Sequence, residues 1–141
     1  MNRVTNVVLV DANGPDRTAF AAVWRARTET PLEMFPSWEP ARRCLDELRR
    51  GWGDMGAPLL IVDPVGLRDW DISLVAALRE NPPGAWFASV IVTRDPTPRL
   101  RRHAQQVAAT DCLFKPPAGA PFDDLARIIE RYWLRTIIVP A

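Results

Sequence analysis

The strongest constraint on the fold is a set of short apolar runs that recur along the chain at similar intervals. Four of them are nearly continuous in apolar or β-branched residues and too short for helices, and a fifth is weaker. The four cover residues 6–10, 58–62, 89–93 and 111–114, and the weaker one covers residues 31–35. Runs of this kind are typical of strands that are buried on both faces of a parallel sheet.

The segments between these runs have the spacing of amphipathic helices. Breakers rich in Gly and Pro bound them, and they cover residues 15–27, 37–50, 71–80, 97–107 and 122–135. Five βα units of this size pack as a parallel sheet with right-handed crossovers. We therefore expect an α/β, flavodoxin-like (βα)5 fold: a doubly wound parallel five-stranded sheet, strand order 2-1-3-4-5, with helices on both faces.

Length and charge narrow the class of protein. The 141 residues, 48% of them apolar, fit a single domain spanning residues 1–141, with residues 136–141 as a C-terminal tail. No segment approaches the roughly 18 apolar residues that a membrane span needs. The net charge of +1 provides no field that would attract nucleic acid or an anionic membrane. We expect a cytoplasmic protein without nucleic-acid or membrane partners.

The two cysteines, Cys44 and Cys112, lie inside periodic apolar segments. They do not form a paired C-x-x-C motif, so we expect buried thiols in a reducing compartment. A disulfide or metal role is not expected.

Lysine occurs once. Of the 18 basic residues, all except Lys115 are arginine. A compact ammonium differs from a planar guanidinium inside a tight anion site, so a chain this rich in arginine would keep lysine where the larger group does not fit. The alternative is a surface lysine without a special role.

The residues that end the predicted strands are chemically distinctive. They are Asp11, Asp63, Thr93 and Lys115. In open parallel sheets, ligands bind beyond the carboxyl ends of the strands, so these side chains should converge. Two carboxylates, a hydroxyl and an ammonium suit the formation of an acyl phosphate, with Mg²⁺ as the natural cation.

Residues 8–17, 59–63, 90–93 and 113–116 contain these four positions, in order and at suitable spacing. Together they resemble the CheY-like receiver domains of bacterial response regulators, over nearly the whole chain. The resemblance implies that Asp63 is the phosphoacceptor and, with Asp11, a metal ligand. It also implies that Thr93 is the switch hydroxyl and Lys115 the phosphate contact. Residues 131–140 are similar to the tail of single-domain regulators that partner phytochrome-type histidine kinases.

The acidic pocket departs from the family pattern. Ala12 stands where receivers usually carry a second acid, and Asp16, about a turn into the first helix, is not expected to replace it. Mg²⁺ affinity should therefore be weakened. Pro64 follows Asp63 and has no N–H to offer a phosphoryl oxygen. Leu67 and Asp71 replace the usual proline and glycine, so the loop should take another shape.

The switch positions also depart from it. Arg94 follows Thr93, where receivers generally carry a small residue, and it would either attract phosphate or obstruct the pocket. Cys112 replaces the aromatic residue that usually lies three positions before the lysine. The usual coupling between the hydroxyl and that aromatic residue is not expected here.

The leading hypothesis is a stand-alone receiver in a two-component phosphorelay. It is not an enzyme: it accepts a phosphoryl group on Asp63 from a histidine kinase or phosphotransfer protein and signals by contact with a downstream protein. The alternative is a pseudo-receiver that binds proteins without phosphorylation. A nucleotide or flavin site finds little support, because glycine-rich phosphate loops are missing. The last helix and tail are the best candidate for a homodimer or partner surface, unless the tail only covers the domain's own core.

Overall fold

The computed structural model describes residues 4–50, 57–80, 87–95, 97–106 and 110–134. Each predicted apolar run forms a strand whose bounds differ from the prediction by no more than two residues. The strands are β1 (Val4–Val10), β2 (Leu32–Phe35), β3 (Ala57–Val62), β4 (Ala88–Thr93) and β5 (Thr110–Phe114). The weaker run therefore also forms a strand.

These strands pair into one parallel sheet in the order β2-β1-β3-β4-β5. The register places Val10 beside Val62, and Val62 beside Ile91. The predicted flavodoxin-like order is confirmed. Because all strands run the same way, their carboxyl ends meet at one edge of the sheet.

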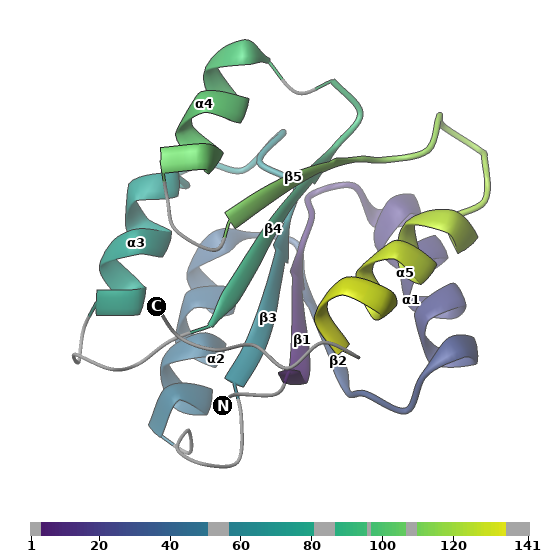
Figure 1. Ribbon diagram of the computed structural model, residues 1–141, viewed down its shortest axis with the longest axis horizontal. Coiled ribbons are helices and arrows are strands. Elements are labelled where there is room, and N and C mark those ends of the chain that lie inside the picture. The colour runs from purple at the N-terminus through teal and green to yellow at the C-terminus, as the bar shows by residue number, and fades with distance from the viewer. Residues whose placement is uncertain (1–3, 51–56, 81–86, 96, 107–109, 135–141) are drawn as a thin grey trace.

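Helices cover both faces of this sheet (Figure 1). They are α1 (Gly14–Arg27), α2 (Trp38–Arg50), α3 (Ile72–Glu80), α4 (Pro98–Gln106) and α5 (Asp123–Ile129), and a π-helical turn, η1 (Glu130–Leu134), continues α5. Figure 1 shows α1 and α5 side by side on one face, and α2, α3 and α4 on the other. The doubly wound arrangement follows the prediction.

Two apolar cores fill the space between the sheet and these helices. The core under α1 and α5 contains the fully buried Trp24, and the core under α2, α3 and α4 contains the fully buried Leu45. Neighbouring residues of β1 alternate between them: Val7 belongs to the first core and Val8 to the second. Since both faces of the sheet are covered, the central strand β3 is apolar and buried throughout.

The predicted last helix differs in its register. The spacing of the apolar residues in this helix predicts an inward stripe that includes Leu125, Ile128, Ile129 and Tyr132, but Ile128 and Tyr132 are 36% and 67% exposed. The buried stripe instead continues through Ala126. Ile128 lies at the margin of the stripe, and Tyr132 lies in the π-helical turn η1, whose wider turn changes the register of the stripe.

The two thiols were expected to be buried, and this is wrong: Cys44 and Cys112 are only half-buried. Cys44 Sγ donates to Glu33 Oε2 at 3.1 Å. Partial burial, together with that carboxylate, raises the pKa of Cys44 to about 12. The thiolate form of Cys44 is therefore disfavoured, which lowers its reactivity as a nucleophile.

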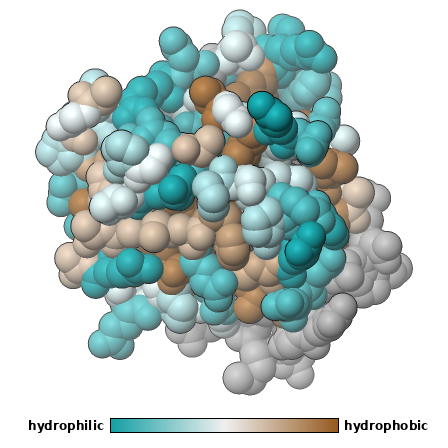
Figure 2. All heavy atoms as spheres, turned by 180° about the vertical axis from the view of Figure 1, so that it is seen from behind, coloured by the Kyte–Doolittle hydropathy of each residue, from teal (hydrophilic) through white to brown (hydrophobic). Residues whose placement is uncertain are grey.

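The surface is mixed. Figure 2, seen from behind, shows hydrophobic patches separated by hydrophilic side chains. Across the described ranges, no helix has both the length and the apolar character that a membrane span requires.

The connection after β3 begins with a tight turn. Leu67 N–H donates to the Pro64 carbonyl at 3.1 Å, and Gly66 has a φ of +80°. A β carbon added at Gly66 would lie 3.2 Å from Cβ of Ala12. The turn therefore requires glycine for its backbone conformation and also for its close approach to the residue after Asp11.

Three glycine-to-alanine variants separate these two effects. Gly66→Ala should lower the free energy of unfolding by about 2 kcal/mol or more, since it combines strain with a close contact. Gly119 has a φ of +82° with open space around it, so Gly119→Ala should cost only about 1 kcal/mol. Gly14→Ala has neither problem and should change stability by less than about 1 kcal/mol. Urea unfolding of the three variants measures the order, and equal losses would contradict the analysis.

Candidate functional site

The backbone of the sheet fixes three of the predicted site residues at its carboxyl edge. Asp63 N–H donates to the Val10 carbonyl at 2.9 Å, and Lys115 N–H donates to the Thr93 carbonyl at 3.0 Å. The hydrogen-bond ladder thus continues one residue beyond the strands. Asp11 is held to β2 in the same way. The convergence inferred from the strand ends is what the structure shows for Asp11, Asp63 and Lys115.

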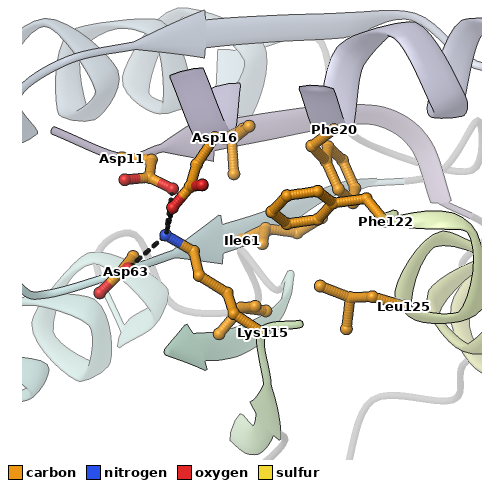
Figure 3. A pocket seen from close by; sticks show the side chains of 10 residues that line it. Asp11, Asp16, Phe20, Ile61, Asp63, Lys115, Phe122 and Leu125 are labelled. Atoms are coloured by element: carbon orange, nitrogen blue, oxygen red, sulfur yellow. Dashed lines mark hydrogen bonds and ion pairs between the residues drawn. The ribbon is translucent and has the colours of Figure 1, made fainter. Parts of the chain in front are cut away.

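The ammonium of Lys115 lies at the centre of a buried ion cluster (Figure 3). Its Nζ is 2.6 Å from Asp11 Oδ2, 2.5 Å from Asp63 Oδ2 and 2.9 Å from Asp16 Oδ2. The side chains of all four residues are at most 9% exposed. We call the three carboxylates the acidic cluster. The only lysine of the chain is therefore a buried counterion and not a surface residue.

Asp16 was not expected to reach the pocket, and that expectation is wrong. The helix begins at Gly14, which places Asp16 in its first turn, facing the edge of the sheet. The side chain of Asn13 caps this turn by accepting from Asp16 N–H at 3.1 Å. Capping fixes where the helix begins and therefore which way Asp16 points.

Arg94, which was expected either to attract phosphate or to obstruct the pocket, is paired with Asp16 in the structure. Its Nη1 and Nη2 are 2.6 and 2.8 Å from the two carboxylate oxygens of Asp16. Its Nε donates to the Pro116 carbonyl at 3.0 Å. A bidentate guanidinium–carboxylate pair is among the strongest hydrogen-bonded contacts in proteins. Sequence reasoning missed this pair, although both residues stood out as departures from the receiver pattern.

Backbone N–H groups bind the remaining oxygens of the two predicted metal ligands. Asp11 Oδ1 accepts from Asn13 N–H at 2.9 Å, and Asp63 Oδ1 accepts from Val65 N–H at 3.0 Å. The missing N–H of Pro64 is thus supplied by the next residue. Each oxygen of Asp11 and Asp63 already has a donor.

Thr93, the fourth predicted site residue, is buried, at 2% exposed. Unlike the other three, it is not among the described residues that line the small cavity beside the acidic cluster. That cavity has a volume of about 10 Å³, and Figure 3 shows apolar side chains along it. They include Phe20, Ile61, Phe122 and Leu125. The space is about that of one water molecule, far below the volume that a nucleotide or flavin needs.

The residues do not fit a divalent cation as they are arranged. The ammonium of Lys115 is within 2.6 Å of an oxygen of both Asp11 and Asp63, where a metal ion bridging them would have to bind. Within the described ranges, no group of three His, Cys, Asp or Glu side chains is arranged to hold a metal ion. The metal-ligand roles of Asp11 and Asp63 stay predictions.

The charges of the cluster shift its proton equilibria. Burial alone would lower the pKa of Lys115, but hydrogen bonds to Asp11, Asp63 and Asp16 outweigh it, and the pKa is raised. Burial raises the pKa of Asp11 more than Lys115 and Asn13 lower it. Hydrogen bonds from Arg94, more than those from Lys115, lower the pKa of Asp16 to about 2. Arg94 therefore keeps Asp16 ionised.

Comparison with known proteins is informative at the level of structure. No protein-family model and no curated protein matches the sequence. The Mn²⁺-bound form of response regulator Rcp1 matches with a TM-score of 0.70 and 18% identity, over 97% of this chain and 99% of that chain. The beryllofluoride-activated NtrC4 receiver domain dimer matches with a TM-score of 0.68 and 16% identity, over 93% and 97%.

A third match comes from Saccharomyces cerevisiae, the co-crystal structure of the histidine phosphotransfer signaling protein Ypd1 and the receiver domain of Ssk1. Its TM-score is 0.68 at 17% identity, over 94% of this chain and 91% of that chain. The chain therefore has the fold of CheY-like response regulator receiver domains, at nearly full length on both sides. Structural matches at identities this low establish only the fold, so the chemistry has to be argued from the site itself.

The free energy of unfolding at acid pH should depend on the Arg94–Asp16 pair. A carboxyl whose pKa is about 2 when folded and 3.8 when free stabilises the fold above pH 4 and loses this effect as the pH falls toward 2. The contribution is about 2 kcal/mol. The difference in unfolding free energy between the parent and Asp16→Asn should therefore narrow between pH 4 and pH 2, as measured by chemical denaturation.

Asp124 provides the matched control. Its ion pair with Arg127 is largely exposed, so the difference between the parent and Asp124→Asn should be small throughout this pH range. A parent-to-Asp16→Asn difference that stays constant with pH would contradict the assignment.

Proposed function

We propose that this chain is a signalling domain of the receiver type that accepts a phosphoryl group on Asp63. The observation that carries the proposal is the contact of 2.5 Å between Asp63 and the ammonium of Lys115, at the carboxyl edge of a receiver-like sheet. A carboxylate nucleophile beside a fixed cation is the arrangement that acyl-phosphate formation requires. In this role the chain passes on a signal and is not an enzyme.

The proposed step is a displacement at phosphorus. A carboxylate oxygen of Asp63 forms the new P–O bond, while the P–N bond to the donor histidine breaks and its electron pair stays on the imidazole nitrogen. The oxygen that attacks must first leave its present donor, Lys115 or the N–H of Val65. Lys115 can then pair with the phosphoryl oxygens, and Thr93 is proposed as the switch hydroxyl.

A pseudo-receiver is the second candidate, and the full pairing of the acidic cluster favours it. Every carboxylate oxygen of Asp11, Asp16 and Asp63 already has a donor within the protein. Such a cluster is complete without phosphate. In this reading the domain binds its partner in one constant conformation.

Both candidates act through protein contacts, and the proposed partners are a histidine kinase or phosphotransfer protein and a downstream protein. A groove of about 760 Å³ between β5 and α5 offers a surface for them. Its lining includes Phe114 and Ile128, which are 57% and 36% exposed, and Arg101 stacks over the Phe114 ring at 5.1 Å. Exposed apolar groups beside a cation are typical of a recognition surface.

A cytoplasmic location is part of the proposal, as the composition predicts. Mg²⁺, the cation expected from the sequence, enters no step of it, because Lys115 occupies the place between Asp11 and Asp63.

Intact mass spectrometry after incubation with acetyl phosphate tests the first candidate. The parent should gain one phosphoryl group and Asp63→Ala none, because the nucleophile is removed. Lys115→Ala should still be labelled, but the conformational response to labelling should be smaller than in the parent. The reaction is run with and without Mg²⁺. Labelling that survives in Asp63→Ala would refute the site, and no labelling of the parent by donor or kinase would favour the pseudo-receiver.

We also propose a homodimer through the last helix, whose exposed side of α5 and η1 carries Ile128 and Tyr132. Ile128→Glu should shift sedimentation toward the monomer, since it places a charge in the apolar contact. Leu74→Glu on α3 is the control, because Leu74 is similarly exposed, at 40%, on the other face of the sheet. Equal effects of the two variants would argue against this surface. The tail, residues 136–141, lies outside the described residues.

A further inference from the structure

The site contains as many cationic groups as carboxylates. Lys115 contacts all three members of the acidic cluster, and Arg94 binds Asp16 with both prongs of its guanidinium. A third cation, Arg17, donates from Nη1 to the backbone carbonyl of Asp11 at 2.6 Å. Three buried carboxylates would repel one another strongly without such partners. Here cationic side chains of the chain itself supply such partners.

The position of Arg94 is fixed from three directions. It follows the last residue of β4, its Nη atoms bind Asp16 in α1, and its Nε donates to the carbonyl of Pro116 after β5. All three guanidinium nitrogens therefore have acceptors. The Asp16 side chain is only 9% exposed, so this is not a solvated surface pair.

We propose that Arg94 is a built-in counterion for Asp16 which, together with Lys115, excludes divalent cations from the acidic cluster. The pocket of this domain is then neutralised from within and holds its arrangement without a metal ion. The inference goes beyond the proposed function, because it holds whether or not Asp63 accepts a phosphoryl group.

Two consequences distinguish this role from a simple structural ion pair. With Arg94 in place, Asp16 has no oxygen free to bind a metal ion, and Lys115 is shared among three carboxylates. Without Arg94, Asp16 gains a free oxygen, and Lys115 can move toward it and away from Asp11 and Asp63. The acidic cluster then presents carboxylate oxygens of the kind that Mg²⁺ and Mn²⁺ bind. Removal of one arginine should therefore create metal affinity.

The experiment compares thermal unfolding of the parent, Arg94→Met and Arg27→Met during titration with Mg²⁺, without any phosphodonor. Arg27 is the matched control, because it pairs with the buried Glu130 at 3.1 Å and its replacement changes the net charge equally. NaCl of equal ionic strength corrects for screening. The unfolding temperatures of the parent and of Arg27→Met should not change with Mg²⁺. Arg94→Met should unfold about 5 °C higher when Mg²⁺ is in tenfold excess over its Kd.

The double variant Asp16→Asn/Arg94→Met tests which carboxylate is released. It should lose the response to Mg²⁺ that Arg94→Met gains, because the amide is a poorer ligand without charge. A parent that is stabilised by Mg²⁺ as much as Arg94→Met would overturn the proposal. So would an Arg94→Met variant that folds and binds no metal ion.

If Arg94→Met folds only in the presence of Mg²⁺, the proposal is supported directly. If it does not fold at all, Arg94→Lys replaces it, because lysine keeps the charge but cannot bind both oxygens of Asp16 in one plane. Its affinity for Mn²⁺, measured by electron paramagnetic resonance at low temperature, should exceed that of the parent at least tenfold. Equal affinities would overturn the proposal.

Discussion

The contact between one ammonium and three buried carboxylates is the interaction on which the rest of the site depends. Carboxylates that are this close together and shielded from water repel one another. The free-energy cost of placing them together is far higher in the interior than at the surface. Lys115 makes the arrangement possible, because it is within 2.9 Å of every member of the acidic cluster. The sheet brings these groups to one edge, and the ammonium keeps them together.

The order of the sheet and most of this edge could be predicted from the sequence, because parallel pairing leaves little choice. Five short apolar runs separated by helical segments give one doubly wound sheet, and consecutive parallel strands end on the same side. Asp11, Asp63 and Lys115 follow their strands directly, so their convergence needs no knowledge of packing. The unusual rarity of lysine was a further signal, and it points to the residue that the site depends on most.

The pairing of Asp16 with Arg94 could not be predicted in the same way. The two residues are 78 positions apart, and no periodicity relates them. Their contact depends on the residue at which α1 begins and on the rotamer of a long side chain. A shift of one residue in the start of the helix would turn Asp16 away by more than a quarter of a turn. The same uncertainty in register explains why Ile128 and Tyr132 were assigned to the core and are in fact exposed.

The departures from the receiver pattern form one consistent set when they are considered together. Ala12 lies where a second acid is usual, and its β carbon would be 3.2 Å from one added at Gly66, so a turn packs closely over this position. Arg94 adds a positive charge where a small residue is usual. The first departure leaves out the acid that receivers usually carry beside Asp11, and the second supplies a cation to Asp16, a different member of the acidic cluster. Under the inference drawn above, both departures reduce the need for a divalent cation.

This arrangement also bears on how Asp63 could still react. Freeing one of its oxygens breaks a charge-assisted hydrogen bond, which contributes about 1.5–3 kcal/mol to stability. The ammonium of Lys115 would still have carboxylate partners, because Asp11 and Asp16 stay within reach of it. Under the proposed function, a phosphoryl group would then give Lys115 a new and stronger partner. Whether this domain works as a receiver or as a constant binding module therefore depends on one local balance: the hold of Lys115 on Asp63 against its attraction to phosphate.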